Sequence, residues 1–202
     1  MSNIPDKSKS GRRGIPFAVV GPSGVGKATV LKRVLEEVPG LALVKSLTSR
    51  AARRDDGTLN KYSHVTPAEF EVLIKEGAFL EWAEVHGHYY GTPKSGFEEA
   101  MTGGKDPILE IDVQGAKSLK ALHPEAVLIF VAPPDFGTLR ERLHSRSSEA
   151  EEEIQVRLRD AEREMAQAKD FDYLVINDDL EGAVNLVRDI ILAERERGES
   201  VG

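Results

Sequence analysis

Short apolar runs alternate along the chain with longer segments in which apolar residues recur every three or four positions. The runs predict buried strands, and they lie at 15–21, 41–48, 107–112, 126–134 and 173–178. The spaced segments predict helices, and they lie at 27–38, 67–77, 97–104, 136–146, 149–169 and 179–197. Strands that are apolar on both faces and alternate with helices predict an α/β fold, in which helices cover a parallel sheet.

The segment 46–93 interrupts this alternation. It holds a polar stretch at 49–61 and a run of short strands and turns at 78–93. Between them, Thr66 is suited to cap a helix whose first turn contains Pro67. We therefore expect a small separate lobe inserted into the sheet domain.

The composition fits one globular domain with a small appended lobe, since the 202 residues are 40% hydrophobic and 30% charged. The absence of cysteine excludes disulfides, thiol catalysis and Cys-ligated metals. No apolar run approaches the length of a membrane span. Residues 1–14 form a polar, basic stretch without the apolar centre of a secretory signal, so we expect a disordered tail and a cytoplasmic protein. A transit peptide is the alternative for this stretch, but it has no amphipathic pattern.

The net charge of −7 argues against a general nucleic-acid binder, which usually carries a basic face. An anionic ligand must therefore be held by a local cluster of side chains rather than by the field of the whole molecule.

One stretch predicts such a cluster directly. In "GPSGVGKATV" (21–30), three glycines let backbone N–H groups turn toward an anion, and the next helix adds its positive end. Lys27 can then reach the outer phosphates of a nucleotide. A chance match is the alternative, but the stretch follows a predicted strand and opens a predicted helix, as a phosphate-binding loop requires.

Ala28 departs from the usual phosphate loop, because the hydroxyl that normally follows the lysine binds Mg²⁺. Thr29 is one position late on the helix and is a doubtful substitute. Mg²⁺ keeps several waters and takes ligands from the phosphates themselves, so we expect a weakened metal site with no direct protein ligand. Glu110 and Asp112 can orient those waters, and the alternative is that they are ordinary polar residues at a strand end.

Five stretches outside this loop resemble guanylate kinases. They read "SLTSRAAR" (46–53), "LEWAEVHGHYYGTP" (80–93), "LEIDVQGAKSLK" (109–120), "LRERLHSRSSEAEEEIQVRL" (139–158) and "FDYLVINDDLEGA" (171–183). The resemblance spans roughly residues 15–196. It implies a phosphate-loop core at 15–45, 94–134 and 171–200, a nucleotide-monophosphate lobe at 46–93 and a helical lid at 135–170. It also implies the reaction ATP + GMP = ADP + GDP with Mg²⁺.

The resemblance assigns roles to individual residues. The residues matching the ATP site are Gly21, Pro22, Ser23, Gly24, Val25, Gly26, Lys27, Ala28, Thr29 and Asn177. The residues matching the GMP site are Ser46, Arg50, Arg53, Tyr62, Glu81, Tyr90, Thr92, Glu110 and Asp112. The charged groups implied to act on the transferring phosphoryl group are Lys27, Arg53, Arg146 and Arg157. Forked guanidinium groups independently suit a reaction that gathers several negative charges in one place.

Several of these residues also have an ordinary structural explanation. Tyr62 and Tyr90 can be half-buried aromatic residues, and Arg50 and Arg53 can be solvated in a polar loop. We expect two other arginines, Arg142 and Arg159, to lie on the surface. His86 and His88, in a predicted turn, are expected to be solvent-exposed rather than metal ligands.

The chain also departs from the family's pattern. The loop that usually reads like R-x-P-R-x-G-E is here residues 50–56, without the proline or the glycine and with Asp56 at the acid position, and Ser147 replaces a lid glycine. A freer loop costs more to order around a substrate. Two alternatives remain open: a kinase of another phosphorylated acceptor such as a sugar phosphate, and a non-catalytic module that binds a phosphorylated protein. The second could discard Lys27 and the lid arginines, which are present here.

Overall fold

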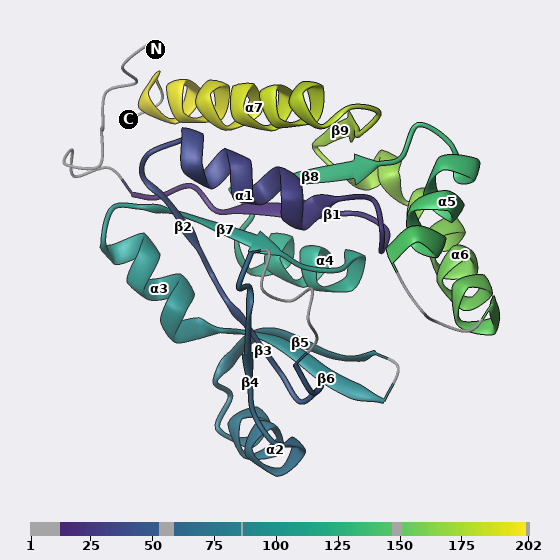
Figure 1. Cartoon of the computed structure of the whole chain (residues 1–202). Coiled ribbons are helices and arrows are strands. Elements are labelled where there is room, and N and C mark those ends of the chain that lie inside the picture. The colour runs from purple at the N-terminus through teal and green to yellow at the C-terminus, as the bar shows by residue number, and fades with distance from the viewer. Residues whose placement is uncertain (1–12, 53–58, 86, 147–150, 201–202) are drawn as a thin grey trace.

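The computed structural model describes residues 13–52, 59–85, 87–146 and 151–200 (Figure 1). Its core is a five-stranded sheet in the order β2-β7-β1-β8-β9, in which every neighbouring pair is parallel. The strands are β1 (Phe17–Val20), β2 (Leu41–Leu43), β7 (Asp106–Glu110), β8 (Val127–Ala132) and β9 (Tyr173–Ile176). Strand β8 is buried along its whole length, as a strand covered on both faces should be.

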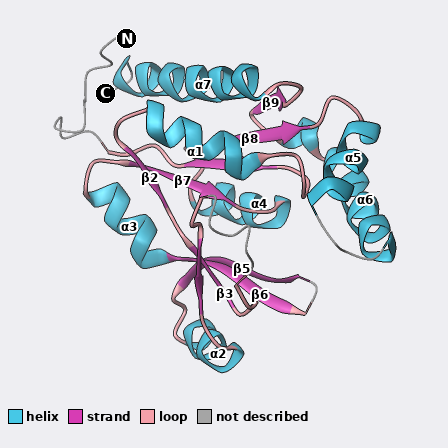
Figure 2. Ribbon diagram, viewed as in Figure 1, coloured by secondary structure: helices cyan, strands magenta, loops and turns pink. Residues whose placement is uncertain are grey.

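Helices cover both faces of this sheet (Figure 2). Helices α1 (Lys27–Glu37) and α7 (Leu180–Ser200) cover one face, where Leu31 and Ile191 are fully buried. Helices α3 (Lys94–Thr102) and α4 (Val113–Leu122) cover the other, where Leu119 is fully buried and Phe97 nearly so. The expected α/β fold, a parallel sheet between helices, is therefore confirmed.

A second sheet has four strands in the order β4-β3-β6-β5. Its strands are β3 (Ser46–Thr48), β4 (Tyr62–His64), β5 (Phe79–Val85) and β6 (His88–Pro93). Helix α2 (Pro67–Lys75) packs on it through Phe70, whose ring stacks on Phe79 and Tyr89. Figure 1 shows this sheet and α2 projecting from one side of the core, so the segment that interrupts the α/β alternation forms a sheet of its own.

Two helices lie beyond the carboxyl end of β8. Helices α5 (Phe136–Arg146) and α6 (Glu151–Met165) pack on each other through a small cluster that includes Leu139, Leu143 and Ile154. A short 3₁₀ helix, η2 (Ala168–Asp170), then leads into β9. No helix in the described part of the chain is long and apolar enough to cross a membrane.

Two elements differ from the expectations. The apolar run 41–48 is two strands, β2 and β3, which belong to different sheets, because the chain leaves the core after Val44. Helix α4 was not predicted, although Asp112 caps it by accepting a hydrogen bond from Gly115 N at 2.7 Å. The predicted start of α2 is confirmed, since Thr66 and Glu69 form a reciprocal capping box.

Candidate functional site

The loop between β1 and α1 adopts a backbone that glycine makes possible. Gly21, Gly24 and Gly26 have φ values of 139°, 85° and 101°, a region that other residues rarely occupy. A Cβ on Gly21 would lie 2.1 Å from the carbonyl oxygen of Val131 in β8. The loop is thus folded tightly at the carboxyl ends of the parallel strands, where ligands bind in sheets of this kind.

The ammonium group of Lys27 lies over this loop. Its Nζ donates to the carbonyl oxygens of Gly21 at 2.6 Å and Pro22 at 3.0 Å. Asn177, which follows β9, donates from Nδ2 to the carbonyl oxygen of Val25 at 2.7 Å and is buried. The side-chain amide expected near the donor nucleotide therefore fixes the loop's backbone.

Arg142, which was expected on the surface, is half-buried and hydrogen-bonded to the main chain. Its guanidinium donates to the carbonyl oxygens of Asn177 at 3.0 Å and Asp178 at 3.3 Å, and its Nη1 lies 3.5 Å from that of Val25. The reason is the packing of α5 against the loop, because a Cβ on Gly24 would lie 2.7 Å from Leu143 of that helix. Arg142 thus ties the loop after β9 to the helix α5, whereas Arg159 is exposed as expected.

In the second sheet, Arg50 and two tyrosines lie together. Arg50 is only 7% exposed, so the alternative interpretation, in which it is solvated in a polar loop, does not hold. Its Cζ lies 5.5 Å from the centroid of the Tyr62 ring, a cation–π geometry. The half-buried rings of Tyr62 and Tyr90 meet edge to face with 5.9 Å between centroids. Guanidinium and phenol groups are suited to hold a phosphate at one place.

Strands β5 and β6 bring a carboxylate and a hydroxyl together. Thr92 is fully buried and its Oγ1 donates to Glu81 Oε1 at 2.5 Å. Burial raises the pKa of Glu81 and the charge of Asp112 adds to that rise, while the Thr92 hydrogen bond opposes it. Ser46, at the start of β3 in the same sheet, is 8% exposed. A half-buried carboxylate that is held by a buried hydroxyl group can recognise the polar edge of a ligand.

The two acids at the carboxyl end of β7, Glu110 and Asp112, have different surroundings. Asp112 uses Oδ1 to cap α4. For that oxygen, the alternative of an ordinary structural role near the strand end therefore holds. Glu110 forms an ion pair with Lys61, which lies directly before β4. Its Oε2 is buried and is the one such side-chain atom among the described residues that lacks a hydrogen-bond partner. Lys61 was not singled out from the sequence, where nothing but its charge in a polar loop marks it.

Of the three arginines expected to act in catalysis, the structure describes the side chain of one. Arg53 lies outside the described residues, as does the side chain of Arg146 at the end of α5. Arg157 lies half-buried on α6. On the same helix, burial raises the pKa of Glu164, and the charge of Lys27 opposes the rise. Glu164 carried no signal in the sequence beyond its place in a charged helix.

No group of three or more potential metal ligands of the His, Cys, Asp or Glu type occurs among the residues that the structure describes. His88 is half-buried rather than exposed, because it starts β6 and pairs with Val85. His86 lies outside the described residues.

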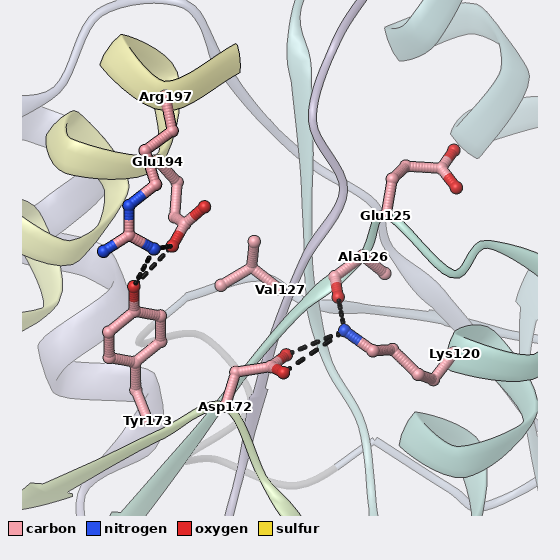
Figure 3. Close-up of a pocket in the computed structure, with 8 residues that line it drawn as sticks. All are labelled: Lys120, Glu125, Ala126, Val127, Asp172, Tyr173, Glu194 and Arg197. Carbon is pink, nitrogen blue, oxygen red and sulfur yellow. Dashed lines mark hydrogen bonds and ion pairs between the residues drawn. The ribbon is translucent and has the colours of Figure 1, made fainter. Parts of the chain in front are cut away.

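A separate hollow of about 410 Å³ lies at the other ends of the core strands, where β8 and β9 begin (Figure 3). Four of its charged groups pair with one another: Lys120 Nζ lies 3.0 Å from Asp172 Oδ2, and Arg197 Nη1 lies 2.6 Å from Glu194 Oε1. Because the phosphate loop is at the carboxyl ends of the strands, this hollow is not part of the candidate site.

Comparisons with known proteins agree with this geometry. The guanylate kinase family model matches residues 13–194. The guanylate kinase of Thermotoga maritima is 42% identical over 92% of this chain and 89% of its own length, and that of Caldanaerobacter subterraneus is 42% identical over 92% and 90%. The crystal structure of guanylate kinase from Anaplasma phagocytophilum superposes with a TM-score of 0.75 at 30% identity, covering 91% of this chain and 87% of that one.

Proposed function

The chain belongs to the guanylate kinase family, and we propose that it transfers the γ-phosphoryl group of ATP to GMP, forming ADP and GDP. The observation that carries this proposal is the second sheet, which holds Arg50 against Tyr62 and Glu81 against Thr92. The first pair suits an acceptor phosphate and the second a base edge, so together they suit a nucleoside monophosphate. The cytoplasmic location expected from the sequence stays a prediction.

On the donor side, the loop 21–29 holds the phosphates of ATP through its backbone N–H groups and the positive end of α1. Lys27 leaves the carbonyl oxygens of Gly21 and Pro22, its present partners, for the outer phosphates. Phosphoryl transfer needs positioning and charge stabilisation more than covalent chemistry, and the anchored loop supplies the positioning. Asn177 contributes by keeping Val25 in place.

On the acceptor side, Arg50, Arg53, Tyr62 and Tyr90 hold the phosphate of GMP. Glu81, when ionised, accepts hydrogen bonds from N1–H and the N2 amine of guanine, while Ser46 donates to O6. Thr92 orients the Glu81 carboxylate through the hydrogen bond to Oε1. Support comes from burial, because a hydrogen bond to a base edge is most selective where water is excluded.

Residues 135–170 act as a lid over the donor, and 46–93 act as the GMP-binding lobe. Arg146 and Arg157 approach the transferring phosphoryl group when the lid closes. The half-buried position of Arg157 on α6, the helix whose Glu164 feels the charge of Lys27, supports this role.

The residues present fit a nucleotide-bound Mg²⁺ ion held mainly by phosphates and water. Ala28 offers no ligand, but the buried Oε2 of Glu110 has no hydrogen-bond partner among the residues that the structure describes and can accept from a metal-bound water. When bound, the ion offsets phosphate charge during transfer. Asp112, whose Oδ1 is committed to the cap of α4, has its other oxygen left for this shell.

The test is the release of ADP from ATP in the presence of GMP, dGMP, AMP, UMP and CMP in turn. The proposal expects turnover with GMP and at most traces with AMP, UMP and CMP. Turnover with none of the nucleotides would contradict it, and equal turnover with all would contradict the assignment of a guanine site.

A further inference from the structure

Lys61 links the two halves of the candidate site. Its ammonium contacts Glu110, at the end of core strand β7, and lies 4.9 Å from the centroid of the Tyr62 ring in the second sheet. The main chain at Lys61 is fixed as well, because its carbonyl oxygen accepts from Ser46 N at 2.9 Å. One side chain thus joins a carboxylate in the core to a tyrosine assigned to the GMP phosphate.

This ion pair is buried. The Lys61 side chain is 20% exposed and that of Glu110 is 7% exposed. Burial lowers the pKa of the Lys61 ammonium, but Glu110 and Tyr62 outweigh burial, so the pKa is raised overall and the group stays charged. Removing one member of a buried pair leaves the other charge uncompensated, which is costly.

Glu110 lies beside β1, since it pairs with Val19 immediately before the phosphate loop. Its charge is therefore close to the place where phosphates gather. With Oε1 on Lys61, its Oε2 is left buried without a partner among the described residues. The ion pair with Lys61 holds the Glu110 carboxylate in one orientation. The ammonium charge also reduces the repulsion between this carboxylate and an incoming phosphate dianion.

We propose that Lys61 is a positioning residue for the acceptor phosphate, which acts through Glu110 rather than by touching GMP. It shields the phosphate of GMP from the Glu110 carboxylate and sets the orientation of that carboxylate. This inference rests on the proposed function, because it takes GMP as the ligand of the second sheet.

The experiment is a double-mutant cycle on the equilibrium dissociation constant of GMP, measured by calorimetry without ATP or Mg²⁺. Lys61→Met should weaken GMP binding about tenfold when Glu110 is present. In the background of Glu110→Gln, the same change should alter the constant less than about twofold, because there is no buried carboxylate left to shield. Lys45→Met, an exposed lysine next to β3, is the matched control and should leave the constant unchanged.

An equal loss in both backgrounds would overturn the proposal, because it is the result of direct contact between Lys61 and the phosphate. No loss in either background would overturn it too. If Lys61→Met alone does not fold, the double variant is compared with Glu110→Gln, neither of which contains the unpaired carboxylate, and an about tenfold loss of GMP affinity in that comparison would overturn the proposal. A parent protein that fails to bind GMP would contradict the proposed function before any variant is compared.

Discussion

The phosphate loop and the second sheet offer different chemical groups to a ligand: main-chain groups in the loop and side chains in the sheet. In the loop, the main chain forms the surface offered to the ligand, and Lys27, Asn177 and Arg142 donate hydrogen bonds to backbone carbonyl oxygens at or beside it. In the second sheet, side chains pair with side chains, as Glu81 does with Thr92. A backbone surface accepts any chain of phosphates, whereas paired side chains distinguish one ligand edge from another. Affinity for phosphate and choice of base are therefore expected to be separable by mutation.

The largest effect is expected in the loop. Lys27→Met should lower kcat/KM at least about 150-fold, because a lost charge contact to the transferring group costs roughly 3 kcal/mol or more. The change should act equally with any base, since the loop does not read it. Coupled ADP release measures the rate, and Lys32→Met, exposed on the same helix, is the control. Turnover within a factor of three of the parent protein would rule out the assigned role of the loop.

Changes in the second sheet, in contrast, should alter the preference for one base over another. We expect the parent protein to prefer GMP over AMP by at least roughly a thousandfold in kcat/KM, because adenine leaves the polar groups of the site unpaired. Glu81→Gln should reduce this preference about 100-fold while changing the melting temperature little.

The measurement is kcat/KM for both nucleotides in both proteins. Glu84→Gln is the matched control, because Glu84 lies on the same strand but is exposed. If the variant discriminates as well as the parent protein, Glu81 does not read guanine.

The loop and the core sheet were the parts most open to prediction from sequence. Gly21, Gly24 and Gly26 fulfil a local backbone requirement, and strand β8 is apolar throughout because both of its faces are covered. Local requirements of this kind can be recognised in the sequence itself. The division of 41–48 between two sheets could not be recognised, since Val44 and its neighbours form one apolar run.

The supporting contacts of the site could not be predicted, because their partners are distant in the chain. Arg142 holds Asn177, 35 positions away, and Lys61 holds Glu110, 49 positions away. In the sequence, nothing distinguishes Arg142 or Lys61 from the other charged residues of a polar helix or loop. Helix α4 was missed for a related reason, since Gly115 in its first turn is a poor helix former and only the cap by Asp112 marks the start.

A pH profile sharpens the contrast between the two regions. Because burial raises the pKa of Glu81, its protonated form persists above the usual range of a glutamate, about 4.3. Guanine recognition needs the ionised form, so kcat/KM for GMP should fall about tenfold per unit as the pH drops below the raised pKa.

Thr92→Val removes a hydrogen bond that lowers the pKa of Glu81 and should move this acid limb to higher pH. The phosphate of GMP also titrates, but identically with both proteins, so the difference between the two profiles isolates Glu81. Coincident limbs would mean that Glu81 does not control the profile.

The smallest effect is expected at Ala28, where the loop departs from its usual chemistry. Ala28→Ser adds a hydroxyl at the position that commonly binds Mg²⁺, so the Mg²⁺ concentration for half-maximal rate should fall several-fold. The rate at saturating Mg²⁺ should change little, because the phosphates and water already supply most of the shell. The base preference should not change, since Ala28 lies in the first turn of α1 and not in the second sheet. An unchanged Mg²⁺ requirement would show that other groups, with Oε2 of Glu110 foremost, already complete the shell. A changed base preference would instead break the proposed separation between a backbone site for phosphate and a side-chain site for guanine.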